Sequence, residues 1–452
     1  MKTKIFLRSF LVATLLCVLT CAVAAHAAEQ KPNIIFILAD DLGYGDLSCY
    51  GGEVPTPNLD RLAREGTRFT QAYVASPICS PSRAALITGQ HPARWRITSY
   101  LQTRKGNRAC EMVDFLDPKA PSLPRVLKAA GYRTAHVGKW HLGGGRDVTN
   151  APPFKEYGYD VGFGTYESPE PHPSITATNW IWSMHDPVKR WDRTKWMVDR
   201  TMEFVQANTS TPAFVNLWLD DPHTPWIPSE EQAQKRGPQG ETKANLRNVL
   251  VEMDRQVGRL LAELRETKLA ENTIVIFMSD NGPLPTFKQS RTAGLRGSKL
   301  SLYEGGVRVP LIAWGPGRVP AGRVDETTVF SSLDIFPTFC ELAGASIPTD
   351  ARPEGRIMTA ALSGKSVERT TPLFWEYGRN TNSFGHPRGV NRSPNVAMRE
   401  GDWKLLVSAD GNGAELYNLK SDSREESNLA GKEAERTAKM KAAALEWRRS
   451  LP

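Results

Sequence analysis

Long apolar runs along the chain predict buried β-strands. Strands are expected over residues 33–38, 132–137, 213–219, 273–278 and 309–314. Several of these runs are apolar with almost no alternation, which is typical of parallel strands covered on both faces.

The segments between these runs predict helices. The clearest lies over residues 242–268, where one apolar stripe recurs at the helical period. Further helices are expected over residues 56–66, 84–89, 122–131, 194–207 and 333–343. The alternation of strand and helix predicts an α/β domain with a largely parallel sheet and helices on both faces. In such sheets ligands bind beyond the carboxyl ends of the strands.

The pattern changes after about residue 350. Short strands separated by turns are expected over residues 373–377, 395–399, 403–407 and 414–418, followed by a charged amphipathic helix over 432–448. We therefore expect a large α/β domain over residues 29–350. A smaller C-terminal subdomain over residues 351–452 is expected to combine an antiparallel sheet with a closing helix.

The N-terminus has the pattern of a secretory signal peptide. Three basic residues precede an apolar run over residues 10–25, and Ala25-His26-Ala27 supplies a small-x-small cleavage site. A membrane anchor competes with this interpretation, but the run is short for a span. A lipoprotein at Cys21 is disfavoured because Thr20 fits poorly before a lipidated cysteine. We expect residues 1–28 to be removed and the protein to be exported, either periplasmic or secreted, without stable membrane insertion.

Composition and charge narrow the classes of partner. Among 452 residues 40% are hydrophobic and 23% charged, as in ordinary globular proteins. The formal net charge of +8 falls by three when residues 1–28 are removed. A mildly basic exported protein suits a polyanionic substrate, but this charge is equally compatible with no preference. No block of Lys and Arg and no zinc-finger spacing indicates nucleic-acid binding.

Four cysteines remain after the predicted cleavage: Cys49, Cys79, Cys110 and Cys340. They are far apart and form no C-x-x-C pair, so the pattern indicates neither a disulfide framework nor a zinc site. One bridge stays possible, either Cys49–Cys110 or Cys110–Cys340, and the sequence does not choose between them.

Charged and amide residues follow four predicted strands where each strand ends. In chain order they are Asp40 and Asp41, Lys139 and His141, His223, and Asp280 and Asn281. The aspartates and the asparagine offer only oxygen ligands, which select Ca²⁺, or less readily Mg²⁺, over zinc. Carboxylates gathered at the strand ends of one sheet would repel one another without a cation between them.

Cationic residues are expected around the same point. Arg83, Lys139 and Lys299, together with the two histidines, would surround it. Three fixed cations and a divalent metal suit a tetrahedral dianion or its ester, and they stabilise the charge that develops on transfer. Taken singly, each residue has a plain structural alternative, such as a surface lysine or a packed loop histidine.

The segment Cys79-Ser80-Pro81-Ser82-Arg83 begins a predicted short helix that Gly89 ends. Pro81 suits the first helical position, where its missing N–H costs nothing, and Gly89 suits the exit. Cys79 would then lie at a helix N-terminus, where free N–H groups favour an anion. The alternative is a buried structural thiol.

This segment and residues 84–89 resemble the signature of the formylglycine-dependent (type I) sulfatases. The resemblance is specific, because a maturation enzyme must read the segment, and it extends over nearly the whole mature chain. Further blocks match in order at residues 40–46, 56–60, 138–143, 222–225, 279–282 and 299–310. The branch resembled most is that of arylsulfatase A and N-acetylgalactosamine-6-sulfatase, which implies an alkaline-phosphatase-like fold. Gln90 departs from the pattern, since an arginine often stands there.

The resemblance implies a role for each predicted site residue. A maturation enzyme converts Cys79 to formylglycine, whose hydrate supplies the nucleophilic oxygen. The implied Ca²⁺ ligands are Asp40, Asp41, the modified Cys79, Asp280 and Asn281. The implied roles of the others are steadying the hydrate for Arg83, binding sulfate for Lys139 and Lys299, protonating the leaving oxygen for His223 with Lys299, and removing a hydrate proton for His141.

We therefore expect an exported sulfuric ester hydrolase that acts on a sulfated carbohydrate or an aryl sulfate. A phosphonate monoester or phosphodiester hydrolase of the same superfamily is the alternative, because it can share the formylglycine and metal site. A non-catalytic glycan-binding protein with an unmodified Cys79 is a third interpretation, and the presence of every expected site residue disfavours it.

Three segments are expected to line the substrate cleft: residues 144–192, 225–240 and 376–395. Three tryptophans in these loops could stack on sugar faces or simply pack the loops: Trp180, Trp182 and Trp226. Three histidines there have no assignable role: His172, His185 and His386.

Overall fold

The computed structural model describes residues 30–235, 241–380 and 389–452. The predicted signal peptide and His386 therefore lie outside the described residues, as do parts of two predicted cleft loops. Within these ranges no helix combines the length and the apolar character that a membrane span requires.

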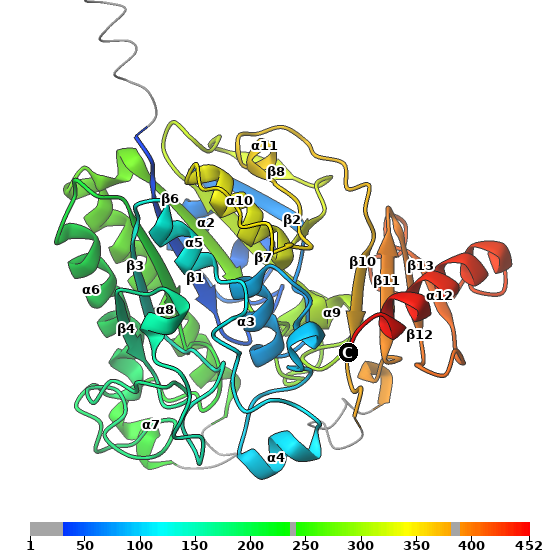
Figure 1. Cartoon of the computed structure of the whole chain (residues 1–452), viewed down its shortest axis with the longest axis horizontal. Coiled ribbons are helices and arrows are strands. Elements are labelled where there is room, and N and C mark those ends of the chain that lie inside the picture. Colours follow the sequence, from blue (N-terminus) through cyan, green and yellow to red (C-terminus); the bar gives the residue numbers. More distant parts are fainter. Residues whose placement is uncertain (1–29, 236–240, 381–388) are drawn as a thin grey trace, which may run out of the picture.

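A nine-stranded sheet with the order β4-β3-β5-β1-β6-β7-β2-β8 forms the centre of the protein, and β9 pairs with β2 (Figure 1). The strands from β4 to β6 run parallel, β7 is antiparallel to both neighbours, and β2 again follows the main direction. Their bounds are β1 Asn33–Ala39, β2 Thr67–Tyr73, β3 Arg133–Gly138, β4 Val161–Gly164, β5 Ala213–Trp218, β6 Thr273–Ser279, β7 Arg308–Trp314, β8 Arg323–Asp325 and β9 Phe330–Ser331. The predicted fold class is confirmed.

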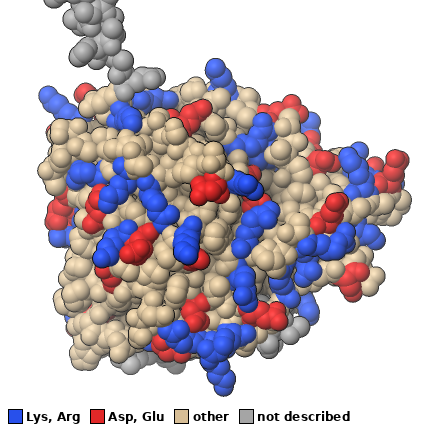
Figure 2. Space-filling model, viewed as in Figure 1, with Lys and Arg blue, Asp and Glu red and all other residues tan. Residues whose placement is uncertain are grey.

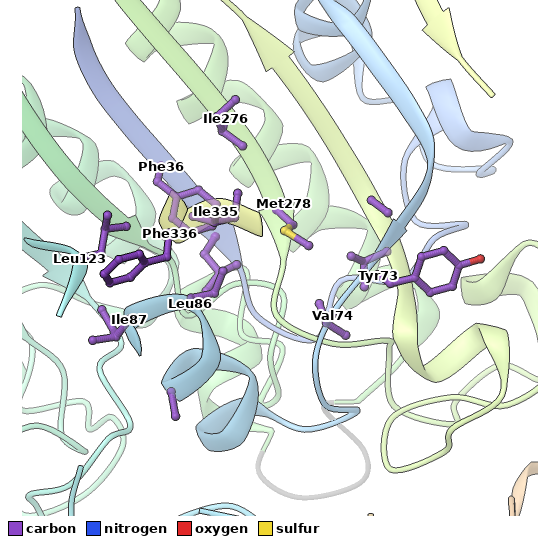
Figure 3. Close-up of a cluster of buried hydrophobic side chains, with 14 of the residues drawn as sticks. Phe36, Tyr73, Val74, Leu86, Ile87, Leu123, Ile276, Met278, Ile335 and Phe336 are labelled. Atoms are coloured by element: carbon purple, nitrogen blue, oxygen red, sulfur yellow. The ribbon is translucent and has the colours of Figure 1, made fainter. Parts of the chain in front are cut away.

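Two layers of helices cover this sheet (Figure 1). Alternate residues of β1 point to opposite faces, so Ile35 and Ile37 meet α2, α6 and α8, whereas Ile34 and Phe36 meet α3, α5 and α10. Figure 3 shows the face of the sheet on which Phe36 lies, where side chains of α3 and α10 lie against β1 and β6. The helix bounds are α2 Pro57–Arg64, α3 Cys79–Thr88, α4 Arg104–Ala109, α5 Leu123–Ala129, α6 Arg193–Gln206, α7 Glu230–Gln234, α8 Lys243–Glu266, α9 Glu304–Val307, α10 Ile335–Leu342, α11 Thr359–Leu362 and α12 Ala434–Arg449.

The sequence did not predict β2, β4, β8 and β9. In β2 the polar residues Arg68, Thr70 and Gln71 interrupt the apolar run, because this strand presents half-buried positions between buried ones. The strands β8 and β9 contain three and two residues and carry too little pattern to be recognised.

The C-terminal residues form a four-stranded antiparallel sheet with the order β10-β11-β12-β13. Its strands are β10 Leu373–Glu376, β11 Val396–Glu400, β12 Trp403–Val407 and β13 Glu415–Asn418. On one face Val396 and Leu405 pack against Met440 of α12. On the other face Trp375 and Leu406 belong to the core of the large sheet. The smaller sheet is thus built into the main core on one side.

On the face shown in Figure 2, Lys and Arg are mixed with Asp and Glu over most of the surface. A group of Lys and Arg gathers at the lower edge, over α4, whose sequence is RKGNRA. The net positive charge is therefore spread over this face, with one local concentration.

A buried ion network joins the two sheets. The Nζ atom of Lys404, on β12, lies 2.9 Å from Oε1 of Glu304 and 3.0 Å from Oε1 of Glu425, and all three side chains are fully buried. Glu304 also accepts a hydrogen bond of 2.7 Å from the hydroxyl of Tyr73, at the end of β2. One ammonium group therefore neutralises carboxylates that have no access to water.

We expect Lys404→Met to lower the free energy of unfolding by about 3–5 kcal/mol, because it removes the closest cation of two buried carboxylates and leaves only Glu304 with another, Arg308 at 3.5 Å. Urea denaturation measures this difference. The control is Lys439→Met, which removes an exposed ammonium 3.7 Å from Glu400 and should change stability little. Equal effects of the two variants would contradict a stabilising role for the network.

Candidate active site

The carboxyl ends of β1, β3, β5 and β6 meet at one edge of the large sheet, as the parallel pairing requires. They carry the residues that the sequence singled out: Asp40 and Asp41, Lys139 and His141, His223, and Asp280 and Asn281. The strand β2 ends at the same edge and leads into Cys79. Five strand ends and one helix N-terminus therefore converge.

Cys79 is the first residue of α3 and is only 3% exposed. Pro81 is the third helical residue and not the first, which the helix tolerates because the N–H groups of the first turn have no intrahelical partner. Gly89 ends the helix in the left-handed region at φ 66°, as predicted. Burial raises the pKa of the Cys79 thiol to about 11. Its Sγ atom lies 3.6 Å from Nζ of Lys299.

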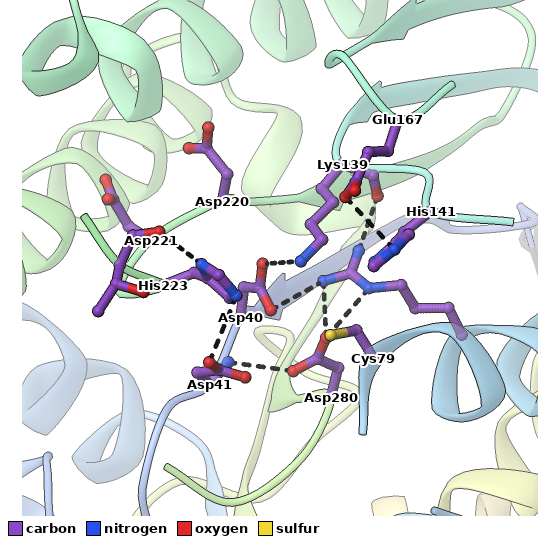
Figure 4. Close-up of polar contacts among 12 residues, drawn as sticks. Asp40, Asp41, Cys79, Lys139, His141, Glu167, Asp220, Asp221, His223 and Asp280 are labelled. Atoms are coloured by element: carbon purple, nitrogen blue, oxygen red, sulfur yellow. Dashed lines mark hydrogen bonds and ion pairs between the residues drawn. The ribbon is translucent and has the colours of Figure 1, made fainter. Parts of the chain in front are cut away.

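Each of the buried carboxylates Asp40, Asp41 and Asp280 has a close cationic partner, and Figure 4 shows one of these pairs, Asp40 with Lys139. The pairs are Lys139 with Asp40 at 2.5 Å, Lys299 with Asp41 at 2.6 Å, and Arg83 with Asp280 at 2.8 Å. Burial alone would raise the pKa of Asp40, but Lys139, His223 and Arg83 hold it well below its ordinary value. Burial and the neighbouring Asp40 raise the pKa of Asp280 to about 7.

Arg83 is fully buried and orients several parts of this edge. Its Nε and Nη2 groups both donate to Oδ2 of Asp280, at 3.0 and 2.8 Å, and its Nη1 group donates to the carbonyl of Lys139 at 2.7 Å. Such a fork fixes the carboxylate and the end of β3 at once. The guanidinium of Arg83 thus holds Asp280 and Lys139 in place from inside the protein.

The oxygen donors fit a hard divalent cation. Oδ1 of Asp40 and Oδ1 of Asn281 are buried and have no hydrogen-bond partner within the described residues. The amide of Asn281 donates 2.7 Å to Asp41, which leaves its oxygen available. Ligand atoms of Asp40, Asp41 and Cys79 lie within 4.8 Å of one another. Buried oxygens without partners are costly unless a ligand completes them, so this donor set suits Ca²⁺ or Mg²⁺.

His141 is held as a neutral imidazole. Its Nε2 atom lies 3.1 Å from the carbonyl oxygen of Leu101 and 3.3 Å from Oε2 of Glu167, so Nε2 carries the hydrogen. Its Nδ1 atom is buried and has no partner within the described part of the chain. Burial lowers the pKa of His141 to about 3. The free Nδ1 lone pair is thus able to accept a proton.

His223 has the opposite tautomer. Its Nδ1 group donates to the carbonyl oxygen of Thr224 at 2.6 Å, and its Nε2 atom lies 3.6 Å from Oδ2 of Asp41. The side chain is 27% exposed. Burial lowers the pKa of His223. Arg190 donates to the backbone carbonyl of His223 at 3.1 Å and pairs with Asp221 at 2.7 Å, which fixes the turn after β5.

A pocket of ≈ 190 Å³ opens onto this edge. It is lined by the predicted residues Asp40, Cys79, Lys139, His141, His223 and Lys299. Four other predicted residues lie behind its wall and are completely buried: Asp41, Arg83, Asp280 and Asn281. The structure therefore brings all the predicted site residues together.

The sequence did not single out several residues that belong to this pocket. Glu167 pairs with His141, Arg146 pairs with Glu167 at 2.6 Å, and Arg190 and Arg193 bind Asp220. Glu167 and Arg190 lie in the loop over residues 144–192, which was expected to line the cleft. Nothing in the pattern of that loop marks these residues, because their partners are fixed only by folding.

The tryptophans and histidines of the predicted cleft loops are either packed against the protein or exposed to solvent. Trp226 is 1% exposed and its indole N–H donates to the carbonyl of Pro222 at 2.8 Å, so it packs the loop. Trp180 is 54% exposed. His172 packs on Trp196 with ring centroids 4.9 Å apart, and His185 is exposed.

The four cysteines of the described residues form no disulfide: Cys49, Cys79, Cys110 and Cys340. Neither bridge that the sequence left possible is formed.

The chain is similar to sulfatases in sequence and in structure. The profile of the Sulfatase family matches residues 32–345, and that of the N-sulphoglucosamine sulphohydrolase C-terminal family matches residues 298–449. N-acetylgalactosamine-6-sulfatase of Canis lupus familiaris is 35% identical over 397 residues, which cover 80% of this chain and 72% of the relative. Human arylsulfatase A is 33% identical over 382 residues, covering 78% and 72%. The solved structure of Ps i-CgsB in complex with k-i-k-neocarrahexaose has a TM-score of 0.76 and 28% identity, with 94% of both chains covered.

We expect Glu167→Gln to lower kcat on 4-nitrophenyl sulfate by roughly 10–100-fold, since outer partners of site residues carry effects of this size. The variant keeps the volume of the side chain but removes the charge that orients His141 and Arg146. Glu156→Gln makes the same change at an exposed position and serves as the control. Unchanged turnover in Glu167→Gln would show that the orientation of His141 does not depend on this carboxylate.

Proposed function

The chain belongs to the sulfatase family, as its motifs predicted, and on this premise we propose that it hydrolyses the sulfate ester of a sulfated carbohydrate with a formylglycine at position 79 and bound Ca²⁺. As a sulfatase it is a sulfuric ester hydrolase. The observation that carries the proposal is the convergence of Cys79, Lys139 and Lys299 at one pocket, with Arg83 behind its wall and two buried oxygens, Oδ1 of Asp40 and Oδ1 of Asn281, that have no hydrogen-bond partner within the described residues.

The environment of Cys79 argues against the thiol itself as the nucleophile. A thiol whose pKa is about 11 is almost entirely protonated near neutral pH, and a protonated thiol is a weak nucleophile. The proposal therefore includes a formylglycine-generating maturation enzyme as a partner. It also includes export through the signal peptide over residues 1–28, which suits a polymeric sulfated substrate outside the cytoplasm.

The donor set proposed for Ca²⁺ is Asp40, Asp41, Asp280, Asn281 and the modified residue 79. When present, Ca²⁺ and the aldehyde hydrate would supply charge neutralisation and a nucleophilic oxygen. Lys139 and Lys299 are held by Asp40 and Asp41 at the pocket wall, where their ammonium groups can bind sulfate oxygens.

Each histidine presents one ring nitrogen to the reaction. Thr224 accepts the hydrogen on Nδ1 of His223, so His223 can protonate the leaving oxygen only with a second proton bound at Nε2, the nitrogen that lies 3.6 Å from Oδ2 of Asp41. Leu101 and Glu167 keep a hydrogen on Nε2 of His141, so Nδ1 is the atom that can take a proton from the nucleophile. Each histidine thus has one nitrogen fixed by the protein and one available for the reaction.

A carbohydrate substrate is supported by the names of the relatives. The canine relative is an N-acetylgalactosamine-6-sulfatase, and Ps i-CgsB was solved with an oligosaccharide. The predicted alternative was a phosphonate monoester or phosphodiester hydrolase. Rates on matched sulfate and phosphate esters separate the two activities.

We expect Cys79→Ala to abolish turnover of sulfate esters while the fold is kept, because the side chain contributes the nucleophile but little packing volume. Circular dichroism and activity on 4-nitrophenyl sulfate measure the two effects. Mass spectrometry of the wild-type peptide that contains residue 79 should find the aldehyde in protein from the native host. An intact thiol there, or an active Cys79→Ala variant, would refute the proposed nucleophile.

We expect Ca²⁺ to stabilise the chelator-treated protein, by about 2.7 kcal/mol at a hundredfold excess over Kd. Thermal unfolding at several Ca²⁺ concentrations measures the shift. Asn281→Ala removes one proposed ligand and should weaken the shift, whereas Asp410→Asn changes an exposed carboxylate and should preserve it. An equal shift in Asn281→Ala and the wild type would exclude Asn281 as a ligand.

A further inference from the structure

A second pocket of ≈ 380 Å³ lies beside the catalytic one. Its lining includes Trp180, Trp182 and Ser183 of one loop and Pro225, Ile227 and Gln232 of another. Neither group contains a residue of the catalytic machinery described above.

The two pockets share a wall. Ile181 lines the catalytic pocket, while its chain neighbours Trp180 and Trp182 line the second one. In the same way Thr224 lines the catalytic pocket and Pro225 lines the second. One residue of each loop therefore separates the two spaces. Across this wall the ring of Tyr166, which lines the catalytic pocket, lies 6.1 Å from the ring of the exposed Trp180, so Trp180 is placed next to the sugar that would follow a residue bound in the first pocket.

The lining of the second pocket combines aromatic surface with hydrogen-bonding groups. Trp180 is 54% exposed, although a large aromatic side chain is normally buried, and Trp182 is half-buried. The hydroxyl of Thr178 is buried at this pocket and has no partner within the described residues. The indole of Trp226 forms the floor and is held by Pro222. Apolar ring faces beside the unpartnered hydroxyl of Thr178 and the polar side chains of Ser183 and Gln232 match a sugar ring, whose faces carry C–H groups and whose rim carries hydroxyls.

We propose that Thr178, Trp180, Trp182, Ser183, Pro225 and Gln232 form an outer subsite that binds the sugar joined to the sulfated residue. This inference rests on the proposed function, because it places the sulfated residue in the catalytic pocket. It makes the preferred substrate a sulfated oligosaccharide of at least two residues, rather than an aryl sulfate or a free sulfated monosaccharide.

The test compares substrates that carry the same ester with and without a neighbouring sugar. The probes are N-acetylgalactosamine 6-sulfate and disaccharides that carry it at the reducing or the non-reducing end, with 4-nitrophenyl sulfate as a small ester. We expect the wild type to prefer one disaccharide over the monosaccharide in kcat/KM by roughly tenfold or more, the size of one good aromatic contact.

Trp180→Ala and Trp182→Ala should remove most of this preference and change kcat/KM on the monosaccharide by less than roughly twofold, since the monosaccharide does not reach the outer subsite. Trp180→Phe keeps a ring and should recover part of the preference. Ile357→Ala truncates a side chain that is 48% exposed on the C-terminal connection and is the control for loss of exposed apolar surface.

Calorimetric binding of the preferred disaccharide to Cys79→Ala, with and without Trp182→Ala, gives a second measurement that needs no turnover. The outer subsite is overturned if both tryptophan variants keep the disaccharide preference, or if they lose activity equally on disaccharide and monosaccharide. A wild type that hydrolyses 4-nitrophenyl sulfate without preferring either disaccharide overturns the subsite but leaves the proposed function intact. A wild type that hydrolyses none of the four esters refutes both.

Discussion

The whole active site depends on the placement of three carboxylates in the dry interior of the sheet. Buried like charges are tolerated only when counter-charges and hydrogen bonds compensate them. The closest cations of Asp40, Asp41 and Asp280 are Lys139, Lys299 and Arg83 respectively, and Arg83 also lies 3.7 Å from Asp40. These cations come from three segments that are far apart in sequence, so the strand order and the position of α3 have to bring them together. The electrostatic balance of the site is therefore a property of the fold.

In each of the two site histidines a backbone carbonyl determines which ring nitrogen carries the hydrogen. His141 keeps its hydrogen on Nε2 because Leu101 accepts it, and His223 keeps its hydrogen on Nδ1 because Thr224 accepts it. The nitrogen that remains free therefore differs between the two rings. The protein thus decides by tautomer which nitrogen of each ring faces the reaction, and the outer partner Glu167 reinforces one of these choices.

The edge of the sheet was predictable because its signals are local. Continuous apolar runs locate β1, β5 and β6, and the acidic residues that follow them must share an edge if the strands are parallel. The strand β2 was missed because its alternating polar residues face half-buried positions. Glu167 and Arg190 were missed for another reason: each acquires its role from partners that only tertiary contact supplies, and no spacing in the sequence encodes that contact.

The central position of β1 has a consequence for how the chain reaches this structure. Asn33, at the start of β1, bonds to the backbone of a residue 180 positions later on β5 and to a side chain 240 positions later on β6. The first strand to be synthesised is thus among the last to be paired. Helices synthesised earlier, such as α2 and α3, can cover the two faces of residues 33–39, but one edge of this strand stays without its native partner until β6 exists. The segment that organises the finished catalytic edge therefore depends on contacts of long sequence separation, which slow folding.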